Sequence, residues 1–528
     1  MKALSIFVVL LTTTTLLFAQ QPVKQDTISP RKGDTDKQLE DIKAKKVRLH
    51  SDSLGNEPNA SLLVDSAIQN KYGDLLNDDT AYNLRYPFWK PAIEVIAMNA
   101  LIFSADRYFF KYDYSTSVSL STWNHNMKTG WAWDSDRFGM NFSSHPYTGS
   151  IYFNAGRSNG YGYFGSLCYS LEGSLMWEYF GENTLPSYND LINTSLNGAF
   201  LGEILYRISS NILDDRTKGR ERVFREIAAG LIDPMRGFNR LLQGKTLRTT
   251  NKEVYAKEPI NISLFAGIHS INNGRNTFFQ NGTNNPMINL QLDYGNPFEI
   301  RDRQPFSFFK VRMEFQSGVG RKVLDNVLGY GILFGKNYQV GNLAMLLGGF
   351  QYYDYWDTKS FELISVGFGG GMNTKYPISK TFNLYTGVHL ALIPFGANSG
   401  ILGPNTSEFR DYSYVDGLEG KIESKLVLGK YAELSLIYYQ YLMNTYPKVI
   451  TKDYIPSSND VAGYNFVGIF KPNITLHIYK SVNIGFEHYI YYNDRYLKGL
   501  PATHAVNTEE KIFLLLYMED SQRRGHYN

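Results

Sequence analysis

The sequence lacks the features that mark several common classes of protein. Cys168 is the only cysteine among 528 residues, which excludes an intramolecular disulfide. Beyond the first residues, no stretch of about 18 uninterrupted apolar residues is present, which argues against a membrane-spanning helix. The nearest stretch, residues 92–110, is interrupted by charged residues such as Glu94 and Asp106. Cys168 lies in an apolar helical run, where we expect a buried, inert thiol.

Other absences exclude further functions. The chain has 53 basic against 50 acidic residues, a net charge of +3, and no long basic run, which excludes a nucleic-acid partner. None of the nine histidines has a zinc-binding spacing, so we expect neither a metal ion nor a cofactor. Asp134 and Asp136 lack the remaining ligands of a calcium loop. No Gly-x-Ser-x-Gly motif marks a hydrolase nucleophile.

Aromatic residues are abundant, although tryptophan contributes little. The chain has 39 Tyr and 33 Phe against 6 Trp. A soluble core needs fewer tyrosines, because each buried hydroxyl requires a hydrogen-bond partner. Tyrosine is well suited to the aromatic girdles of proteins that cross the membrane–water interface. The composition therefore favours a membrane protein.

The N-terminal residues have the pattern of an export signal. Within residues 1–19, Lys2 precedes an apolar stretch and Ala19 ends a plausible cleavage site. No cysteine near that site offers a lipoprotein anchor. Residues 20–82 are polar and rich in charge, which is typical of a flexible periplasmic linker. We expect export by a cleaved signal peptide to the outer membrane of a diderm bacterium.

Residues 258–520 alternate between apolar residues and polar residues or glycine in about twelve segments. This period of two, sustained over the whole region, predicts a transmembrane antiparallel β-barrel with a lipid-facing outer face and a wet interior. A soluble β-sandwich is the competing interpretation, but an apolar face recurs in nearly every segment. The charged positions that we expect to face the lumen are Lys310, Arg312, Glu314, Glu419, Lys421, Glu423 and Lys425.

Turn-forming residues divide the barrel region. Examples are Gly335-Lys336-Asn337 and Tyr479-Lys480-Ser481, which we expect to separate strands. The longer irregular stretches 395–412 and 447–464 predict extracellular loops. Residues 521–528 form a polar tail after the last strand.

Residues 83–245 show helical periodicity and predict a mainly α-helical domain before the barrel. Ser187, followed by Asp190, is the expected N-cap of one helix. Residues 111–162 are rich in glycine and aromatic residues, and we expect them to form a connection. Helices are expected over a segment that Pro87 and Pro91 open and that ends at Phe110, and over residues 163–181, 187–213 and 221–231.

Two of these helices carry small residues at a spacing that allows close packing. Ser166, Ser170 and Ser174 recur every four residues, as do Gly198 and Gly202 on the next helix. The short connection between the helices predicts an antiparallel hairpin. This hairpin would lie against a membrane leaflet, plug the barrel or fold in the periplasm. Glu203 and Arg207 have the i,i+4 spacing of an ion pair.

The helical domain concentrates residues from which an acyl hydrolase could be built. A histidine would be the general base, a serine the nucleophile and a glutamate the group that orients the imidazole. Arg157 and Arg207 would contact a lipid phosphate. We favour the interpretation that these groups satisfy one another's hydrogen bonds, with His145-Pro146-Tyr147 as a turn. The catalytic candidates are His145, Ser150, Ser166, Ser174, Glu178 and Glu203.

Several rare residues occur in a recognisable order in this domain. They are Trp131-Ala132-Trp133-Asp134, Phe138, His145-Pro146-Tyr147-Thr148-Gly149-Ser150, Tyr152-Phe153-Asn154, Arg157, Trp177-Glu178, Pro186-Ser187-Tyr188-Asn189-Asp190, Gly202-Glu203 and Arg207. With these motifs, residues 85–245 resemble an outer-membrane family of Bacteroidota known only as a domain of unknown function. The resemblance implies an outer-membrane location and a helical unit before a barrel, and it implies no activity.

The expected function is a non-catalytic role in outer-membrane biogenesis or assembly. The helical domain would contact periplasmic partners or pack against the barrel. Outer-membrane lipid is the expected partner, with other envelope proteins as further candidates. Two alternatives stay open, an envelope lipid-modifying acyl hydrolase and a small-solute channel.

Overall fold

The computed structural model describes the helical and barrel regions of the chain. The residues described are 85–133, 138–250, 253–273, 283–299, 304–316, 323–358, 361–399, 412–445 and 461–518. The expected signal peptide (1–19), linker (20–82) and polar tail (521–528) lie outside these residues, as do Asp134 and Asp136.

The C-terminal half of the chain forms a closed barrel of twelve strands, each antiparallel to its neighbours. Strands that follow one another in the chain are paired, and β1 closes the barrel on β12, with Ile262 opposite Met518. The expected barrel is confirmed, and the β-sandwich is excluded. The strands are β1 (Ile260–Asn273), β2 (Thr283–Tyr294), β3 (Phe309–Gln316), β4 (Leu324–Val340), β5 (Leu343–Asp357), β6 (Glu362–Pro377), β7 (Phe382–Ser399), β8 (Tyr412–Leu428), β9 (Ala432–Thr445), β10 (Gly463–Tyr479), β11 (Val482–Leu497) and β12 (Thr503–Met518).

The two ends of the barrel differ in their connections. Four tight turns, the connection 295–308 and the outer ends of β1 and β12 lie at one end, which we call the short-turn end. The strand ends that flank residues 400–411 and 446–462 lie at the opposite end, which we call the long-loop end; they are Ser399, Tyr412, Thr445 and Gly463. One expected turn was wrong, because Gly335-Lys336-Asn337 lies inside β4 and the chain reverses at Gly341, whose φ is +57°. Gly335 lies in the strand against Gly348, where a side chain would collide with the backbone.

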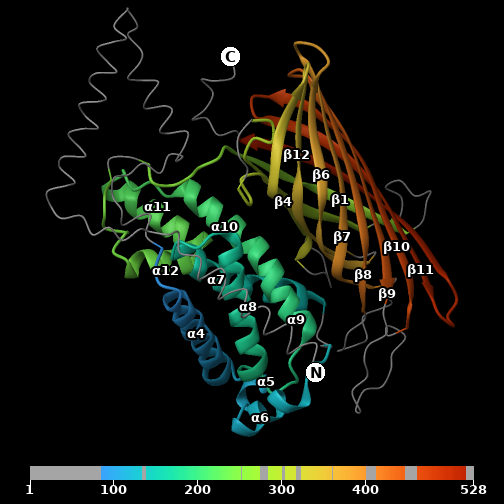
Figure 1. Ribbon diagram of the computed structural model, residues 1–528. Helices are drawn as coiled ribbons and strands as arrows, with labels where there is room; N and C mark the ends of the chain where they lie inside the picture. The colour runs from blue at the N-terminus through green and yellow to red at the C-terminus, as the bar shows by residue number, and fades with distance from the viewer. Residues whose placement is uncertain are drawn as a thin grey trace, which may run out of the picture.

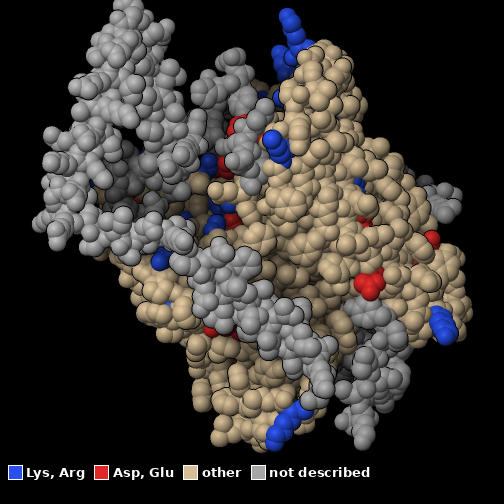
Figure 2. All heavy atoms as spheres, in the orientation of Figure 1, with Lys and Arg blue, Asp and Glu red and all other residues tan. Residues whose placement is uncertain are grey.

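The outer face of the barrel is apolar where the helices leave it uncovered. Exposed residues on this face include Leu390, Leu392, Ile422, Leu442 and Leu514. On the face shown in Figure 2, most of the described surface belongs to residues other than Lys, Arg, Asp and Glu. Such a contiguous apolar band is characteristic of a wall that contacts lipid.

The helices precede the barrel in the chain, and two short π-helical turns, Met140–Ser144 and Asn193–Asn197, extend α7 and α10 at their N-termini. Residues 111–162, expected as a connection, contain three helices. His145-Pro146-Tyr147, expected as a turn, begins α7. Among the described residues, no helix has both the length and the apolarity to cross a membrane. The helices are α4 (Trp89–Ser104) with a π-helical extension (Ala105–Phe110), α5 (Asp113–Thr116), α6 (Leu120–Thr129), α7 (His145–Ser158), α8 (Tyr163–Phe180), α9 (Tyr188–Ile192), α10 (Gly198–Ile212), α11 (Gly219–Ile232) and α12 (Pro234–Leu242).

Helix α7 is the centre of the helical domain. A Cβ atom on Gly149 would lie 1.8 Å from the carbonyl oxygen of Thr194, and one on Gly198 would lie 2.6 Å from the backbone of Gly149. On the other side of α7, Gly156 packs against Ser166 of α8. The small residues therefore allow α7 to contact both α8 and α10. Helix α8 contacts the N-terminal extension of α10, where Ser170 donates to the carbonyl oxygen of Thr194 at 3.1 Å, but Gly198 and Gly202 pack on α7, a helix that the sequence analysis missed.

The helical domain lies beside the barrel, against its outer wall (Figure 1). In β5, Gln351, Tyr353 and Tyr355 alternate with residues that point into the lumen, so they face outward. The hydroxyl of Tyr353 donates to the carbonyl oxygen of Phe142 at 2.7 Å, and Tyr163 donates to Gln351. The domain therefore does not plug the barrel.

The contact between the two parts runs diagonally along the wall. Tyr294 and Phe309, beside the short-turn end, belong to the same buried apolar cluster as Phe200 of α10. Near the long-loop end, Asn141 donates to the hydroxyl of Tyr412 at 2.8 Å. The ring of Trp133 lies 4.6 Å from that of Tyr414, measured between centroids. The helical domain therefore lies alongside the wall from one end of the barrel to the other.

Candidate functional sites

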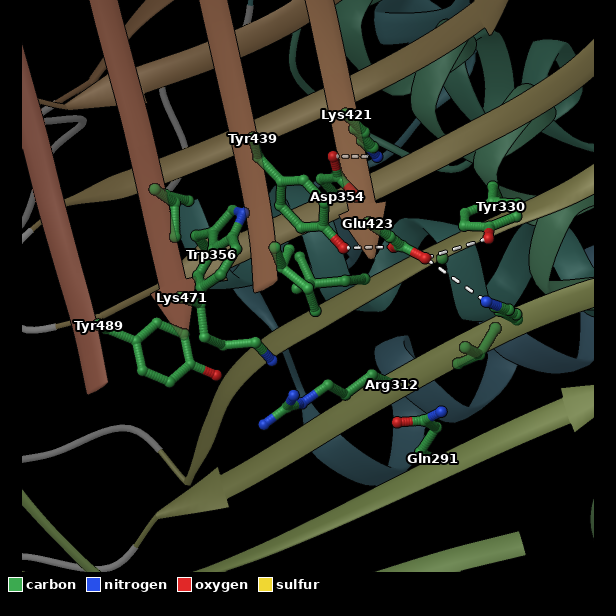
Figure 3. Close-up of a pocket in the computed structure, with 16 residues that line it drawn as sticks. Gln291, Arg312, Tyr330, Asp354, Trp356, Lys421, Glu423, Tyr439, Lys471 and Tyr489 are labelled. Atoms are coloured by element: carbon green, nitrogen blue, oxygen red, sulfur yellow. Dashed lines mark hydrogen bonds and ion pairs between the residues drawn. The ribbon is translucent and has the colours of Figure 1, made fainter. Parts of the chain in front are cut away.

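Charged side chains meet across the barrel lumen (Figure 3). Lys421 and Glu423 of β8 pair with Asp354 of β5 at 2.5 Å and with Lys310 of β3 at 3.4 Å, respectively. Tyr439 donates to the other carboxylate oxygen of Glu423 at 2.8 Å. Strands β3 and β8 are not neighbours, so an ion pair between them requires that their side chains reach through the interior.

A second group of charges lies around β3, β11 and β12. Arg312 donates to Glu487 at 2.9 Å, and Lys511 pairs with Glu314. The carboxylate of Glu487 also lies 3.6 Å from the ammonium of Lys471. We call these two groups the lumen network. Opposite charges alternate through it, as buried charges require.

The seven residues expected to face the lumen do not all lie in this network. Glu419 accepts a hydrogen bond from Ser365 at 2.5 Å and lies 3.8 Å from Lys421. Lys425 lies nearer the short-turn end, where it is half exposed and pairs with Glu433 of the adjacent strand at 3.6 Å. Lys310, Arg312, Glu314, Lys421 and Glu423 belong to the network described above.

Aromatic rings fill the lumen nearer the long-loop end. Trp356 of β5 and Tyr491 of β11, on opposite sides of the barrel, have ring centroids 6.3 Å apart. Phe361, Tyr441 and Tyr489 belong to the same buried cluster. A cavity of about 100 Å³ remains between these rings and the charges. The interior of the barrel is therefore filled with side chains over much of its length.

In the helical domain, the carboxylate of Glu203 binds two arginines. It is fully buried and lies 2.7 Å from Nε of Arg157 and 2.8 Å from Nε of Arg207. The second pair confirms the expected i,i+4 ion pair. Arg207 also donates to the carbonyl oxygen of Pro305, at the start of the barrel wall, at 2.6 Å. This cluster joins α7, α10 and the connection that precedes β3.

His145 lies at the opposite end of α7 from Glu203. Its Nδ1 is 3.1 Å from the hydroxyl of Thr194, and its Nε2 is 3.6 Å from the carboxylate of Asp190. Glu182 lies near this pair, and burial raises the pKa of its carboxyl to about 7, with Asp190 adding to the rise and His145 opposing it. His145 therefore connects α7 to the segment that contains α9.

The expected serine nucleophiles lie elsewhere. Ser150 donates to the carbonyl oxygen of Tyr147 at 2.6 Å, and Ser174 donates to that of Asp190 at 3.5 Å. Ser166 is buried against Gly156. In the part of the chain that the structure describes, none of the three hydrogen-bonds to His145. The structure therefore brings His145 and Asp190 together, but not the serines.

Glu178 and Ser187 join α8 to α9. The hydroxyl of Ser187 accepts a hydrogen bond from the backbone N–H of Asp190 at 3.4 Å, which confirms Ser187 as the N-cap. The N–H of Ser187 donates to the carboxylate of Glu178 at 2.7 Å. This glutamate thus has a structural partner on the next helix.

Two further observations bear on the sequence-based expectations. Cys168 is half-buried, not fully buried, and burial raises the pKa of its thiol, which disfavours the reactive thiolate. Across the described ranges, no group of three or more His, Cys, Asp or Glu side chains could hold a metal ion.

Sequence reasoning missed the basic residues that surround Arg157 and Arg207. Arg236 and Arg240 of α12 and Lys245 after it line one cavity with these two arginines. The missed signal was the pattern of α12, in which Arg236 and Arg240 are four residues apart while Phe238 and Leu241 point elsewhere.

Comparisons with known proteins assign no activity. The family model described as a domain of unknown function (DUF3943) matches residues 130–235. No curated protein matched the chain.

Similar solved structures include porins. The NanC porin has 7% identity and a TM-score of 0.24, covering 47% of this chain and 98% of its own. An anion-selective porin from Comamonas acidovorans has 8% identity and a TM-score of 0.22, covering 50% and 100%. The outer membrane channel DcaP of Acinetobacter baumannii has 6% identity and a TM-score of 0.21, covering 49% and 96%. Likeness at this level carries no argument about transport.

Proposed function

We propose that this protein is a non-conducting outer-membrane barrel with a non-catalytic role in envelope biogenesis or assembly. The observation that carries the proposal is the position of the helical domain on the outer wall. A barrel built for transport needs an open interior, whereas this one is filled by the lumen network and the rings around Trp356. Its helical domain instead packs on the outer face of the wall, where Tyr353 donates to the carbonyl oxygen of Phe142.

The absence of an assembled catalytic group supports the non-catalytic role. Among the described residues, His145 pairs with Asp190 and Thr194, Glu178 with Ser187, and Glu203 with two arginines. Apart from the pair of Glu203 with Arg207 within α10, each of these contacts joins two segments of the domain. The polar residues therefore have structural partners, as buried polar groups require.

Conductance measurements test the closed barrel. We expect the purified, folded protein to give no steady current in planar lipid bilayers. The double variant Trp356→Ala, Tyr491→Ala removes two rings that meet across the lumen, and it serves as a control in which current should increase. A steady current from the unaltered protein would support the small-solute channel instead.

A deletion strain tests the role in the envelope. We expect the protein in the outer-membrane fraction, with heat-modifiable migration on a gel. Loss of the protein should broadly lower the amounts of other outer-membrane proteins. A discrete change in lipid A acylation, with those proteins unchanged, would favour the acyl hydrolase.

A further inference from the structure

Helices α11 and α12 expose large apolar side chains, whereas the arginines of α12 face inward; α11 also exposes the ion pair of Glu221 with Arg225. Phe224, Leu231 and Leu241 are 66–77% exposed, whereas Arg236 and Arg240 are each 4% exposed. The two helices meet closely, since a Cβ atom on Gly237 would lie 2.8 Å from Cα of Gly230. A water-exposed hairpin has the opposite arrangement. An outward apolar face on a short amphipathic helix is the arrangement of helices that lie at a membrane interface.

The inward side of α12 lines a basic cavity of about 350 Å³. No Asp or Glu is among its described lining residues. Tyr206, Tyr255, Asn239 and Gln243 add further polar groups to the wall. We call it the cationic cavity; its charged lining residues are Arg157, Arg207, Arg236, Arg240 and Lys245.

Carboxylates behind this lining hold several of the basic groups in place. Glu203 binds Arg157 and Arg207, and Arg240 pairs with Glu226 at 2.6 Å and with Asp215 at 2.9 Å. Fixed in this way, the guanidinium groups lose little conformational freedom when an anion binds. The cavity is therefore preorganised for an anion.

The guanidinium of Arg236 has N–H groups that can donate hydrogen bonds to such an anion. Its Nη1 donates to the carbonyl oxygen of Tyr206 and to the hydroxyl of Ser210, each at 2.7 Å. Within the described residues, Nε and Nη2 make no hydrogen bond. The guanidinium lies over the ring of Tyr206, 4.1 Å from its centroid, which holds its plane in position. A guanidinium with two donors on one edge matches the geometry of two phosphate oxygens.

We propose that the cationic cavity binds the phosphate of a membrane phospholipid, whose acyl chains lie against the outward face of α11 and α12. The cavity is lined by Val254 and Tyr255, just before β1, and by Gln304, just before β3, so it lies near the short-turn end. In outer-membrane barrels this end faces the periplasm, which assigns the lipid to the inner leaflet. The assignment of the leaflet rests on the outer-membrane location proposed above.

A phospholipid is favoured over a soluble phosphate because the protein offers a surface both for the phosphate and for the acyl chains. The cavity supplies the charge, and the exposed residues of the adjacent hairpin supply an apolar surface. This surface belongs to the helical domain, which packs on the apolar outer face of the barrel. A site for a soluble anion would need no such surface.

Binding can be measured on the full-length folded protein in detergent with dioctanoyl phosphatidylglycerol. We expect saturable binding of this lipid, no binding of dioctanoylglycerol, which lacks the phosphate, and much weaker binding of inorganic phosphate. Arg236→Gln should weaken lipid binding about tenfold or more, because it removes a charged hydrogen-bond donor. Arg225→Gln on α11 is the matched control, since Arg225 pairs with Glu221 outside the cavity and should bind as the unaltered protein does.

A second variant separates lipid from soluble phosphate. Phe224→Ser with Leu241→Ser should weaken phosphatidylglycerol binding and leave inorganic phosphate binding unchanged. Equal affinity for inorganic phosphate and lipid would overturn the lipid assignment, and unaltered lipid binding by Arg236→Gln would overturn the site. Heat-modifiable migration of each variant shows that it is folded. Since conductance and location are measured separately, failure of lipid binding in a closed outer-membrane barrel would refute this inference alone.

Discussion

Glu203 is the carboxylate that pairs with Arg157 and Arg207 in the centre of the helical domain. It is fully buried, and two guanidinium groups share its carboxylate. Replacement by alanine leaves these cations buried without their partner. We expect Glu203→Ala to lower the free energy of unfolding by about 3–5 kcal/mol. The measurement is the amount of assembled protein together with its unfolding midpoint in urea.

An exposed ion pair is the control for this variant. Glu221→Ala removes a partner of Arg225 on the surface of α11, where such a pair contributes only about 0.3–0.5 kcal/mol. Normal assembly of Glu203→Ala, with loss of a lipid-modifying activity, would contradict the structural role and favour catalysis.

The charge of Lys245 gives the cationic cavity a pH dependence. Burial lowers the pKa of this ammonium, Arg240, Arg236 and Lys90 add to the effect and Asp215 opposes it, so that the pKa is about 8. Lys245 is therefore protonated at pH 7 and loses its positive charge as the pH rises through 8. We expect phosphatidylglycerol to bind less tightly at pH 9 than at pH 7. Phosphatidylglycerol itself does not titrate in this range.

Lys245→Gln is the control for the pH profile. Without the titrating ammonium, binding should be weaker at pH 7 and nearly independent of pH up to 9. A profile that keeps its full slope in this variant would show that another group is responsible.

At the scale of elements, the glycines of α7 and α10 determine how closely these helices pack. A side chain on Gly198 would meet the backbone of Gly149, whereas one on Gly202 would meet the ring of Phe153 at 2.7 Å. The ring of Phe153 can rotate away from an added side chain, whereas the backbone at Gly149 can move only if the whole helix shifts. We expect Gly198→Leu to abolish folded, heat-modifiable protein and Gly202→Leu to reduce its yield.

Gly165→Ala on α8 is the matched control. The added methyl group would lie 3.3 Å from the ring of Tyr161, a contact that a small shift relieves. This variant should keep nearly the full yield. Equal yields from Gly198→Leu and Gly165→Ala would show that α7 and α10 do not need to pack so closely.

The strands and helices also show how much of the fold could be predicted from the sequence. The period of two predicted the barrel and its strand number, because each strand carries its own apolar face. Helix α7 was missed because Pro146, Gly149 and Gly156 lower its intrinsic helix propensity. The same glycines are required for contacts with α8 and α10, which a local pattern does not contain.

The candidate site was predictable to a similar degree. Sequence spacing alone predicted the pair of Glu203 with Arg207, which lies on one helix. It did not predict Arg157 as the second partner of Glu203, because that contact joins residues 46 positions apart. Likewise, the alternation in β3 and β8 indicates a polar face but not that Lys310 meets Glu423. Strand tilt decides which residues share a level in the barrel.

For the whole molecule, the register of the barrel determines where charge is tolerated. Ile422 lies on the outer face of β8, is 49% exposed and is flanked in sequence by Lys421 and Glu423, which point inward. We expect Ile422→Arg to lower the free energy of unfolding in lipid vesicles by about 2–4 kcal/mol near the bilayer midplane.

An arginine at the end of the barrel is the control for this substitution. Tyr431→Arg, in the turn between β8 and β9, should cost only about 0–1 kcal/mol, because the side chain reaches the interface. Equal costs at the two positions would contradict a membrane-crossing register. Urea unfolding followed by heat-modifiable migration measures both.

The closure of β1 on β12 has a consequence for the order in which the chain folds. Every other strand pair joins segments adjacent in the chain, whereas this pair joins residues near 262 to residues near 518. Closing so long a loop costs the most entropy, so this pair should form last. The buried contacts between the helices and the barrel lie largely on β2 to β8, away from that junction. Helices and an open sheet can therefore dock before the barrel closes, and the helical domain would then act as a folding template for half of the wall.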